Sequence, residues 1–547
     1  MALGFDSRLS PRGRRMRAVS LSARVGSPLP DPRAIPTHGL RSGQGVRSQV
    51  AAVLAAVALL ASACTGTGAN AGSGNGDGGS GTGGGETGGS SLAWKDCGDG
   101  FECAKLPVSL DHSKPDGKKI ELSVIRLPAS GDRIGSILIN PGGPGASGVQ
   151  YARSARTVVS KAVRDRFDVV GFDPRGVGDS APVRCLSSSE LDTYVGLDSS
   201  PDSPGEITML EEGSRRFASG CQARAGKLLP YVGTASAARD MDLLRAAVGD
   251  DRLTYLGKSY GTQLGAAYAD LFPDRVRALV LDGAVDPSLG PLEMNTAQAR
   301  GFEVALDAFL EDCLAATDCP FRGSVASARE EIAALLRRAD TTPLTNGTGD
   351  GRTVTEAWTT LGLITPLYDR QAWPVLRQAL GLALKGDGTT LLRMADLLID
   401  REANGEYTNQ TEANLAVNCV DAPYPADSAS YAAAARKAAK EAPLFGAYVM
   451  WSSLPCAYWP ARGVQREKID APGAPPIMVV GTLRDPATPY QWSEALASQL
   501  SSGVLVGFDG DGHTAYLTGS TCVDRLVDDY LIDLAVPKNG IRCPKIG

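Results

Sequence analysis

Polar and apolar positions follow a strand–helix rhythm in the first half of the chain. Residues 119–127 alternate between polar and apolar side chains, as in a strand with one buried face, and residues 167–172 fit a buried strand. A helical pattern over 234–248 leads into another short apolar run at 253–256. Strands that alternate with helices in this way predict an α/β domain with a mostly parallel sheet.

The rhythm stops after Asp282 and resumes only at residues 476–481, which fit another buried strand. The chain between them carries helical patterns instead, at 297–315, 327–339 and 428–441. An insertion of helices between two strands of one sheet explains this split. A separate second domain is the alternative, but the flanking segments would still have to return to the same sheet.

The chain therefore divides into five expected parts. Residues 92–287 form the first part of an α/β core, residues 288–470 a helical cap, and residues 471–547 the second part of the core. Residues 64–91 are rich in Gly, Ser and Thr, cannot bury a core, and predict a linker. Residues 1–63 predict a leader and signal peptide.

The export signal within this leader is an apolar run at residues 50–60. The run is too short to span a bilayer, and Arg41 and Arg47 precede it. It ends in Leu60-Ala61-Ser62-Ala63-Cys64, which is similar to a bacterial lipobox, in which Cys64 becomes the lipidated first residue. A flexible linker after Cys64 would span roughly 30 Å. An ordinary secretory signal that is cleaved nearby is the alternative.

Composition favours an exported globular protein. The 547 residues are 43% apolar, which is enough for a sizeable core. The net charge of −6 argues against nucleic acid or an anionic membrane surface as a partner. We therefore expect a monomer that contacts a membrane only through a lipid anchor at Cys64.

Eleven cysteines also indicate an oxidising compartment. Without Cys64, ten remain, the even number that a set of disulfides requires. Ten cysteines allow about 945 pairings, and the sequence does not choose among them. Neighbours along the chain suggest Cys97–Cys103, Cys185–Cys221, Cys313–Cys319, Cys419–Cys456 and Cys522–Cys543. Metal binding is the other reading, but the chain has no Cys-x-x-Cys pair and no clustered histidines, so we expect no metal.

The segment Gly257-Lys258-Ser259-Tyr260-Gly261 has the surroundings that a nucleophilic serine needs. The apolar run 253–256 precedes it, and residues 262–269 fit a helix. In a strand–Gly-x-Ser-x-Gly–helix turn the serine is strained and its oxygen is exposed, while the glycines let neighbouring backbones pass closely. We expect Ser259 to be the nucleophile; an ordinary Gly-rich turn between a strand and a helix is the alternative.

Such a serine needs a histidine base, and the chain has three histidines, His38, His112 and His513. In serine hydrolases of the α/β-hydrolase type the order along the chain is Ser, acid, His, with the histidine after the last strand. His38 lies in the leader, and His112 lies far upstream of Ser259. His513 follows the strand-like run 504–508, so we expect it to be the base.

The acid that orients the base should follow an earlier strand. Asp485 comes after the strand at 476–481 and directly before Pro486, which fixes the turn. We therefore expect Asp485 to be the orienting acid. The other candidates are Asp282, Asp286, Asp509 and Asp511, any of which can instead be a solvated or turn-capping carboxylate.

Acyl transfer also needs an oxyanion hole, which usually consists of two backbone N–H groups. The first comes from the residue after the nucleophile, here Tyr260. The second comes from a Gly-rich loop after an early strand, and Asn140-Pro141-Gly142-Gly143-Pro144-Gly145 follows the apolar run 136–139. Gly143 is the expected donor; a tight turn that needs Gly for its shape alone is the other reading.

Four motifs in this order resemble those of a known family. They are Asn140-Pro141-Gly142-Gly143-Pro144-Gly145, Gly171-Phe172-Asp173-Pro174-Arg175-Gly176-Val177-Gly178-Asp179-Ser180, Gly257-Lys258-Ser259-Tyr260-Gly261-Thr262 and Asp485-Pro486-Ala487-Thr488-Pro489. The chain is similar, over roughly residues 94–543, to the secreted tripeptidyl aminopeptidases of the prolyl-aminopeptidase group. The prolyl aminopeptidases proper have His where this chain has Pro141, which argues against strict proline specificity.

The resemblance implies an α/β-hydrolase fold, in which a mostly parallel central sheet has helices on both faces and a helical cap is inserted. It also implies a serine peptidase that removes short peptides, tripeptides in this family, from the free N-termini of peptides or proteins. No cofactor is expected. The same triad would serve a secreted esterase or lipase, which is the first alternative. A surface-binding lipoprotein without activity is the second.

An exopeptidase of this kind must reward a free ammonium group, which calls for a carboxylate at the closed end of the cleft. Asp421 lies in the expected cap, beside Cys419 and ahead of Pro423. We expect Asp421 to hold the ammonium, with Glu412 as the second candidate. Either residue can instead be a solvated carboxylate of the cap.

Overall fold

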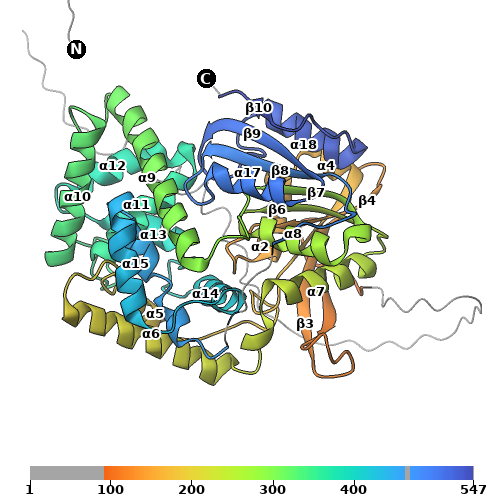
Figure 1. Ribbon diagram of the computed structural model, residues 1–547, viewed down its shortest axis with the longest axis horizontal. Helices are drawn as coiled ribbons and strands as arrows, with labels where there is room; N and C mark the ends of the chain where they lie inside the picture. Colours follow the sequence, from red (N-terminus) through yellow and green to blue (C-terminus); the bar gives the residue numbers. More distant parts are fainter. Residues whose placement is uncertain (1–91, 462, 464–467, 546–547) are drawn as a thin grey trace, which may run out of the picture. The chain divides into compact units, whose positions relative to one another are not determined.

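One ten-stranded sheet forms the core of the described chain, which comprises residues 92–461, 463 and 468–545 of a computed structural model (Figure 1). The expected leader, Cys64 and the linker lie outside these residues. The strands are β1 (Lys95–Asp96), β2 (Glu102–Ser109), β3 (Lys119–Leu127), β4 (Gly135–Asn140), β5 (Phe167–Phe172), β6 (Leu253–Lys258), β7 (Val276–Asp282), β8 (Ile477–Arg484), β9 (Gly503–Asp511) and β10 (Ile541–Cys543). Their order across the sheet is β1-β2-β3-β5-β4-β6-β7-β8-β9-β10.

Most of the sheet is parallel, as the sequence predicts. Pairing is antiparallel from β1 through β2 and β3 to β5, and parallel from β5 through β4 to β10. The expected strands at 119–127 and 167–172 coincide with β3 and β5, and the run 476–481 overlaps β8. Sequence segments far apart, β7 and β8, pair directly, because the chain between them leaves the sheet and returns.

Helices cover both faces of this sheet. In β4, Leu138 belongs to a hydrophobic cluster that includes residues of α7 (Thr234–Ala247) and α8 (Tyr260–Leu271), whereas Ile137 and Ile139 belong to a second cluster that includes residues of α18 (Thr521–Asp533). Successive side chains of a strand point to opposite faces, so β4 is buried on both. The other short helices of the core are α2 (Gly148–Arg153), α3 (Ala155–Val158), α4 (Lys161–Arg166), η1 (Leu229–Tyr231), η2 (Pro273–Arg275) and α17 (Tyr490–Gln499).

The chain between β7 and β8 forms a helical cap, which lies on the left in Figure 1. Its helices are α9 (Pro291–Ala315), α10 (Val325–Thr341), α11 (Glu356–Ile364), η3 (Thr365–Tyr368), η4 (Arg370–Ala372), α12 (Trp373–Ala383), α13 (Thr389–Leu398), α14 (Gln410–Asp421), α15 (Ser428–Glu441), α16 (Gly446–Trp451) and η5 (Leu454–Tyr458). The α/β-hydrolase fold with an inserted helical cap is thereby confirmed.

Two helices that precede the insertion in the chain pack against the cap. On α5 (Ser188–Val195), Asp192 accepts two hydrogen bonds from Arg401, at 2.7 and 2.9 Å. On α6 (Pro204–Ala225), the guanidinium of Arg215 lies 3.9 Å from the ring centre of Tyr458. Residues far apart in the sequence therefore build this side of the cap together.

Five disulfides join pairs of cysteines that are near neighbours along the chain. They are Cys97–Cys103, Cys185–Cys221, Cys313–Cys319, Cys419–Cys456 and Cys522–Cys543, the pairing that chain neighbours suggest. Cys419–Cys456 fastens α14 to η5, and Cys522–Cys543 fastens α18 to β10. Disulfides persist in oxidising compartments, so the set is compatible with export.

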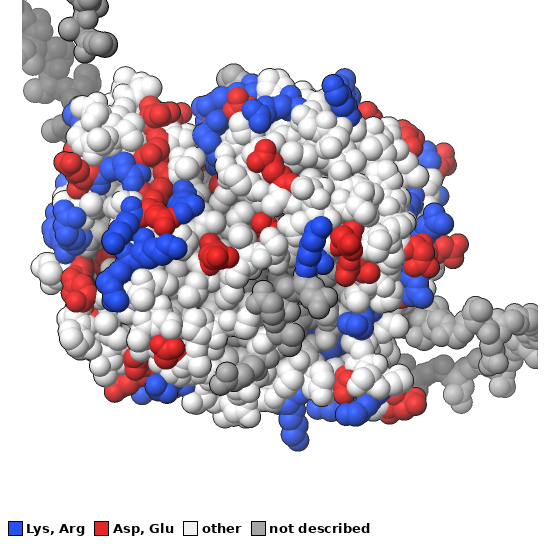
Figure 2. Space-filling view, viewed as in Figure 1, with Lys and Arg blue, Asp and Glu red and all other residues white. Residues whose placement is uncertain are grey.

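The surface carries charges of both signs. On the face that Figure 2 shows, Lys and Arg side chains lie among Asp and Glu side chains, mostly toward its edges, with wide uncharged areas between them. Among the helices of the described residues, none combines the length and the apolar composition that a bilayer span requires.

Within the cap, a carboxyl group lies among other acids. Glu356, at the start of α11, accepts hydrogen bonds from the Ser200 hydroxyl at 2.9 and 2.8 Å. Burial, and then the nearby carboxylates of Asp198, Asp340 and Asp202, raise the pKa of Glu356 to about 7. Burial likewise raises the pKa of Asp198 to about 6.

This carboxyl should make the protein less stable as the pH rises. With a pKa of about 7 in the folded state against an ordinary value of 4.5, Glu356 binds more protons in the folded state between these two pH values. The free energy of unfolding therefore falls through this window, by no more than about 3 kcal/mol. Glu356→Gln should flatten the decline, as urea unfolding followed by circular dichroism between pH 4.5 and pH 8 would show. Glu330→Gln, on the exposed face of α10, is the control, and an equal flattening there would contradict the assignment.

Candidate active site

Ser259 lies in the sharp turn between β6 and α8, as predicted. Its φ of 56° and ψ of −126° are strained for a residue with a side chain. Its N–H donates to the Asp282 carbonyl at 2.9 Å, and its own carbonyl accepts from the Thr262 hydroxyl at 2.6 Å. A Cβ atom at Gly257 would lie 2.4 Å from the Gly261 carbonyl oxygen, so the turn requires glycine there.

His513 and Asp485 form a direct hydrogen bond. His513 Nδ1 lies 2.9 Å from both carboxylate oxygens of Asp485. The carboxylate is buried and accepts further N–H bonds from Ala487, Thr488 and Thr514, at 2.9, 2.8 and 3.1 Å. Because every one of these groups is a donor, the arrangement suits an ionised carboxylate that faces an Nδ1–H. His513 Nε2 is then left to accept a proton.

The serine and the histidine border the same turn. Asp282 accepts the Ser259 N–H, and Gly283 comes directly after it. A Cβ atom at Gly283 would lie 3.3 Å from His513 Cε1, so the imidazole lies directly against this turn. The structure thus joins His513 to Asp485 and places the imidazole against the turn that holds the backbone of Ser259.

The other candidate acids have different partners. Asp282 accepts N–H bonds from Ala515 and Tyr516, and Asp286 accepts from the backbone and hydroxyl of Ser288. Asp509 and Asp511 both pair with Arg484. Of the five carboxylates considered, Asp485 is the one that contacts the imidazole.

The Gly-rich loop after β4 lies against the turn of the serine. A Cβ atom at Gly142 would lie 2.5 Å from the Lys258 carbonyl oxygen and 2.9 Å from the Tyr260 nitrogen. Gly142, with φ of 94°, and Gly143, with φ of 106°, both have backbone conformations that glycine favours. The loop therefore places Gly143 one residue from the point of contact with Tyr260.

Helix α14 of the cap lies across this loop. Its Asn414 Nδ2 donates to the Pro144 carbonyl at 3.0 Å, and Asn418 Nδ2 donates to Asn414 Oδ1 at 3.0 Å. At the end of the helix, the partly exposed Asp421 accepts from the Thr234 N–H at 2.9 Å and from the Thr234 hydroxyl. The Thr234 hydroxyl also lies 2.8 Å from the Tyr260 hydroxyl, so Thr234 links the end of α14 to Tyr260.

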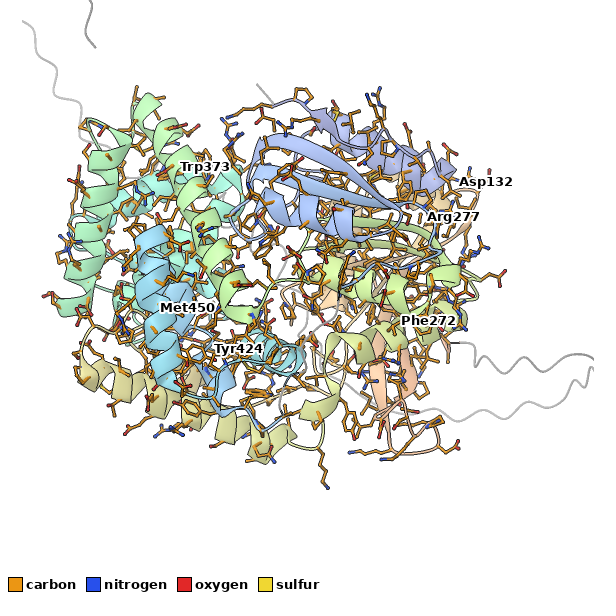
Figure 3. The ribbon with its side chains drawn as sticks, in the orientation of Figure 1. Asp132, Phe272, Arg277, Trp373, Tyr424 and Met450 are labelled. Atoms are coloured by element: carbon orange, nitrogen blue, oxygen red, sulfur yellow. A yellow bond between two sulfur atoms is a disulfide. The ribbon has the colours of Figure 1, made fainter. Side chains whose placement is uncertain are left out.

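A pocket that is partly open to solvent lies beside the end of α14. Gln263, one helical turn beyond Ser259, lines it together with Met294 from α9 and Asn418 from α14. Tyr424, which is labelled in Figure 3 next to α14, also lines this pocket. Both polar and apolar side chains are therefore available to a ligand in this pocket.

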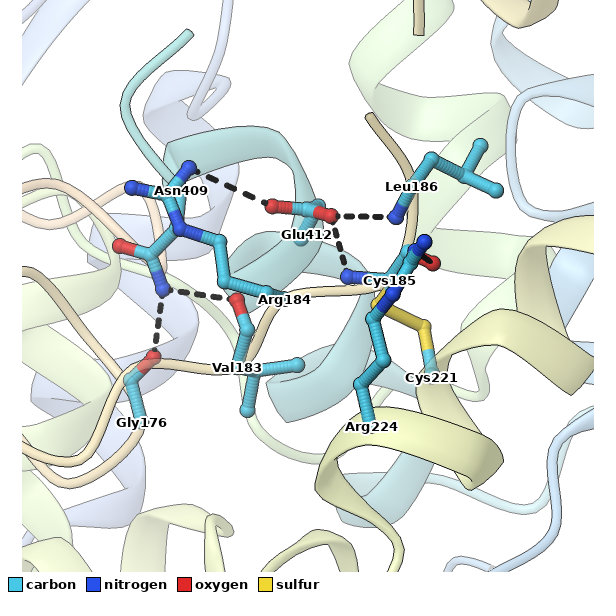
Figure 4. The surroundings of a disulfide bond; sticks show 9 residues. All are labelled: Gly176, Val183, Arg184, Cys185, Leu186, Cys221, Arg224, Asn409 and Glu412. Carbon is cyan, nitrogen blue, oxygen red and sulfur yellow. Dashed lines mark hydrogen bonds and ion pairs between the residues drawn. A yellow bond between two sulfur atoms is a disulfide. The ribbon is translucent and has the colours of Figure 1, made fainter. Parts of the chain in front are cut away.

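Glu412, the second candidate for the ammonium, is buried on the other side of α14. Figure 4 shows its carboxylate as it accepts the N–H groups of Cys185 and Leu186, beside the Cys185–Cys221 disulfide, and pairs with Arg184 at 3.8 Å. Its exposed fraction is 0%. A substrate therefore cannot reach it, whereas Asp421 is partly exposed and its neighbour Ala422 lines the pocket.

Sequence reasoning did not identify Tyr368 of the cap. Its backbone carbonyl accepts the backbone N–H of His513 at 2.8 Å. Its ring lies edge-on to the imidazole, with 5.3 Å between the two ring centres. No local pattern marks this residue, because its partner is distant in the chain.

No group of three or more His, Cys, Asp or Glu side chains within the described ranges could hold a metal ion.

Known proteins match most of the chain. Residues 135–347 match the family described as alpha/beta hydrolase fold, and residues 442–543 match the family described as TAP-like protein. Serine protease Hip1 of Mycobacterium tuberculosis is 40% identical over 81% of this chain and 87% of its own. Carboxylesterase B of the same organism is 39% identical over 81% and 86%. Tripeptidyl aminopeptidase of Streptomyces lividans is 32% identical over 83% and 87%. The chain therefore belongs to the α/β-hydrolase family of serine peptidases that includes the tripeptidyl aminopeptidases.

Proposed function

We propose that the protein is an exported serine exopeptidase that releases tripeptides from free N-termini through Ser259, His513 and Asp485. The observation that carries this proposal is the Asp485–His513 hydrogen bond beside the strained turn of Ser259. It provides an acid, a base and a nucleophile at one edge of the sheet. The relatives named serine protease and tripeptidyl aminopeptidase support a peptide bond as the substrate.

In this proposal, the Ser259 oxygen attacks the carbonyl carbon of the scissile peptide while His513 Nε2 takes the hydroxyl proton. Asp485 keeps the ring oriented and stabilises the imidazolium. The imidazolium gives its proton to the leaving amine, and the tripeptide stays on Ser259 as an ester. Water that loses a proton to the same imidazole then hydrolyses the ester and restores the serine.

The negative oxygen of each tetrahedral intermediate needs donors that are already in place. The backbone N–H groups of Tyr260 and Gly143 fill this role in the proposal. Each such donor typically contributes about 3–4 kcal/mol to the stability of the transition state. These steps require no cofactor.

Helix α14 supports the selection of chain ends. It contacts the Gly-rich loop through Asn414 and the neighbourhood of Tyr260 through Asp421. In this proposal, α14 blocks a peptide that extends from Ser259 toward it. The site then favours binding of a chain terminus over binding of an internal segment. Asp421 lies at the end of α14, and its carboxylate can accept a hydrogen bond from the terminal ammonium of the substrate.

The purified protein should hydrolyse chromogenic tripeptide substrates with a free amine faster than mono- or dipeptide substrates. N-acetylation should lower kcat/KM by about 10- to 100-fold, since a hydrogen bond to a charged group is worth about 1.5–3 kcal/mol. Initial rates over a panel of free and N-acetylated substrates measure both effects. Equal rates for free and acetylated substrates would rule out an exopeptidase.

Ser259→Ala is the matched variant for this panel, because it removes the attacking oxygen and keeps the turn. It should lower kcat by about a million-fold and abolish labelling by a fluorophosphonate. Circular dichroism should match that of the wild type. Labelling that persisted in Ser259→Ala would place the nucleophile elsewhere.

A short-chain esterase is the second candidate function, because one relative is named carboxylesterase B. The same three side chains would act on an ester. Short p-nitrophenyl esters therefore belong in the substrate panel. A kcat/KM for esters far above that for every peptide would favour this second function.

The proposed role of Asp421 in binding the substrate ammonium leads to a separate prediction. Asp421→Asn keeps the shape of the side chain and removes its charge, so KM for free-amine tripeptides should rise by about tenfold. Hydrolysis of a short ester that carries no amine should change little. The control is Asp427→Asn at the exposed N-terminus of α15, where Asn caps as well as Asp does. An equal loss on ester and peptide would show that Asp421 only fastens the cap to the core.

Export and anchoring extend the proposal to residues outside the described ranges. The five disulfides support an oxidising compartment. The lipobox-like Leu60-Ala61-Ser62-Ala63-Cys64 and the linker after it support a lipid anchor at Cys64. We therefore propose a surface lipoprotein whose catalytic part lies just outside a bacterial membrane.

In its native host, the protein should sediment with membranes and carry a lipid at Cys64. Cys64→Ala should release it into the medium or block its processing, because the modified residue is gone. Detergent partitioning and mass spectrometry of the mature N-terminus measure both outcomes. A mature protein that starts well after Cys64 and is soluble in the medium would support plain secretion instead.

A further inference from the structure

Asp282, at the end of β7, bonds to two of the loops that form the candidate site. Its backbone carbonyl accepts the Ser259 N–H at 2.9 Å. Its carboxylate accepts the Ala515 N–H at 2.9 and 3.1 Å and the Tyr516 N–H at 3.0 Å. One residue therefore connects the turn of the serine to the loop that carries His513.

The carboxylate of Asp282 has no contact with solvent, since its exposed fraction is 0%. Burial raises its pKa, and the Lys258 ammonium and the N–H groups of Tyr516 and Ala515 oppose that shift. Lys258 Nζ lies 3.9 Å from Oδ2 of Asp282 and donates to the Tyr516 carbonyl at 2.9 Å. Lys258 directly precedes the serine, so the turn also supplies the cation for this carboxylate.

The histidine loop needs more than one anchor because its backbone is strained. Thr514, directly after His513, has a φ of 68°, which few residues with side chains adopt. Asp485 holds this residue through its N–H at 3.1 Å, and Asp282 holds the two residues that follow. If the second anchor were lost, the imidazole could turn away from Ser259 while its bond to Asp485 stayed intact.

We propose that Asp282, together with Lys258, is a positioning residue that sets the imidazole of His513 relative to Ser259. It acts through the backbone of Ala515 and Tyr516 and touches neither the substrate nor the imidazole. In this arrangement Asp485 orients the imidazole ring of His513, and Asp282 fixes the position of the loop to which the ring is attached. This inference rests on the proposed triad but is independent of the substrate that the triad cleaves.

The test uses Asp282→Asn and the rate of fluorophosphonate labelling. The amide keeps the size of the side chain, but its nitrogen cannot accept the Ala515 N–H that the second carboxylate oxygen accepts. The charge that faces Lys258 is also lost, so the loop should shift. We expect labelling and kcat to fall by about 10- to 100-fold, because a displacement of about 1 Å costs as much as 100-fold. KM should stay within twofold, because the cap and the pocket are untouched. A purely structural weakening would lower the melting temperature without this separation of kcat from KM.

Asp528→Asn is the matched control, since Asp528 is a partly buried carboxylate that bonds the side chain of Tyr516 rather than its backbone. It should label at the wild-type rate. Should Asp282→Asn fail to fold, Lys258→Met gives the same readout with a smaller loss, because it removes only the ammonium. The double variant should lose less than the product of the two single losses, because both residues hold the same loop at Tyr516.

Wild-type labelling by Asp282→Asn, or by Lys258→Met where Asp282→Asn does not fold, would overturn the inference. So would losses that multiply in the double variant. If the fluorophosphonate does not label even the wild-type protein, the proposed triad is wrong, and the role of Asp282 is then not the cause. The two failures are therefore distinguishable.

Discussion

The register of the parallel strands is the constraint on which the candidate site depends. Asn140 lies opposite Gly257, and Lys258 lies opposite Asp282, so β4, β6 and β7 end at the same level. Asp282 in turn lies opposite Val480 in β8. A slip of one residue in any of these pairs would turn every side chain of that strand to the other face. The Gly-rich loop, the serine turn and the acid loop meet only because these strands share one register.

Buried charge at this edge of the sheet is stabilised by backbone donors. Asp485 and Asp282 are both buried, and burying a carboxylate without partners costs several kcal/mol, by the usual order of magnitude. Each offsets this cost by accepting N–H groups from the segment that contains His513. The same bonds hold that segment in a strained conformation, as the bonds of Ser259 hold its turn. The same hydrogen bonds therefore stabilise the buried carboxylates and hold the proposed catalytic residues in place.

The cap contributes to the site as well as covering it. Tyr368 accepts the backbone N–H of His513, and α14 reaches from the Gly-rich loop to Thr234. The disulfide Cys419–Cys456 fastens the end of α14 to η5, so this helix is attached to the rest of the cap at the place where it meets the core. A cap held in this way suits the proposed release of short peptides from free N-termini.

Local patterns in the sequence were enough to predict the serine turn and the inner strands of the sheet, because each depends on residues a few positions apart. His513 was chosen from its order along the chain after Ser259 and the expected acid. Asp485 was favoured by its strand and its proline, but four other carboxylates stayed open as alternatives. Tertiary structure alone decided among them, through the bond to the imidazole. It also placed Tyr368 on His513, buried Glu412 against Cys185, and gave Asp282 its two bonds. These contacts join residues far apart in the chain, and a single sequence carries no local pattern that records which distant strands and helices will meet.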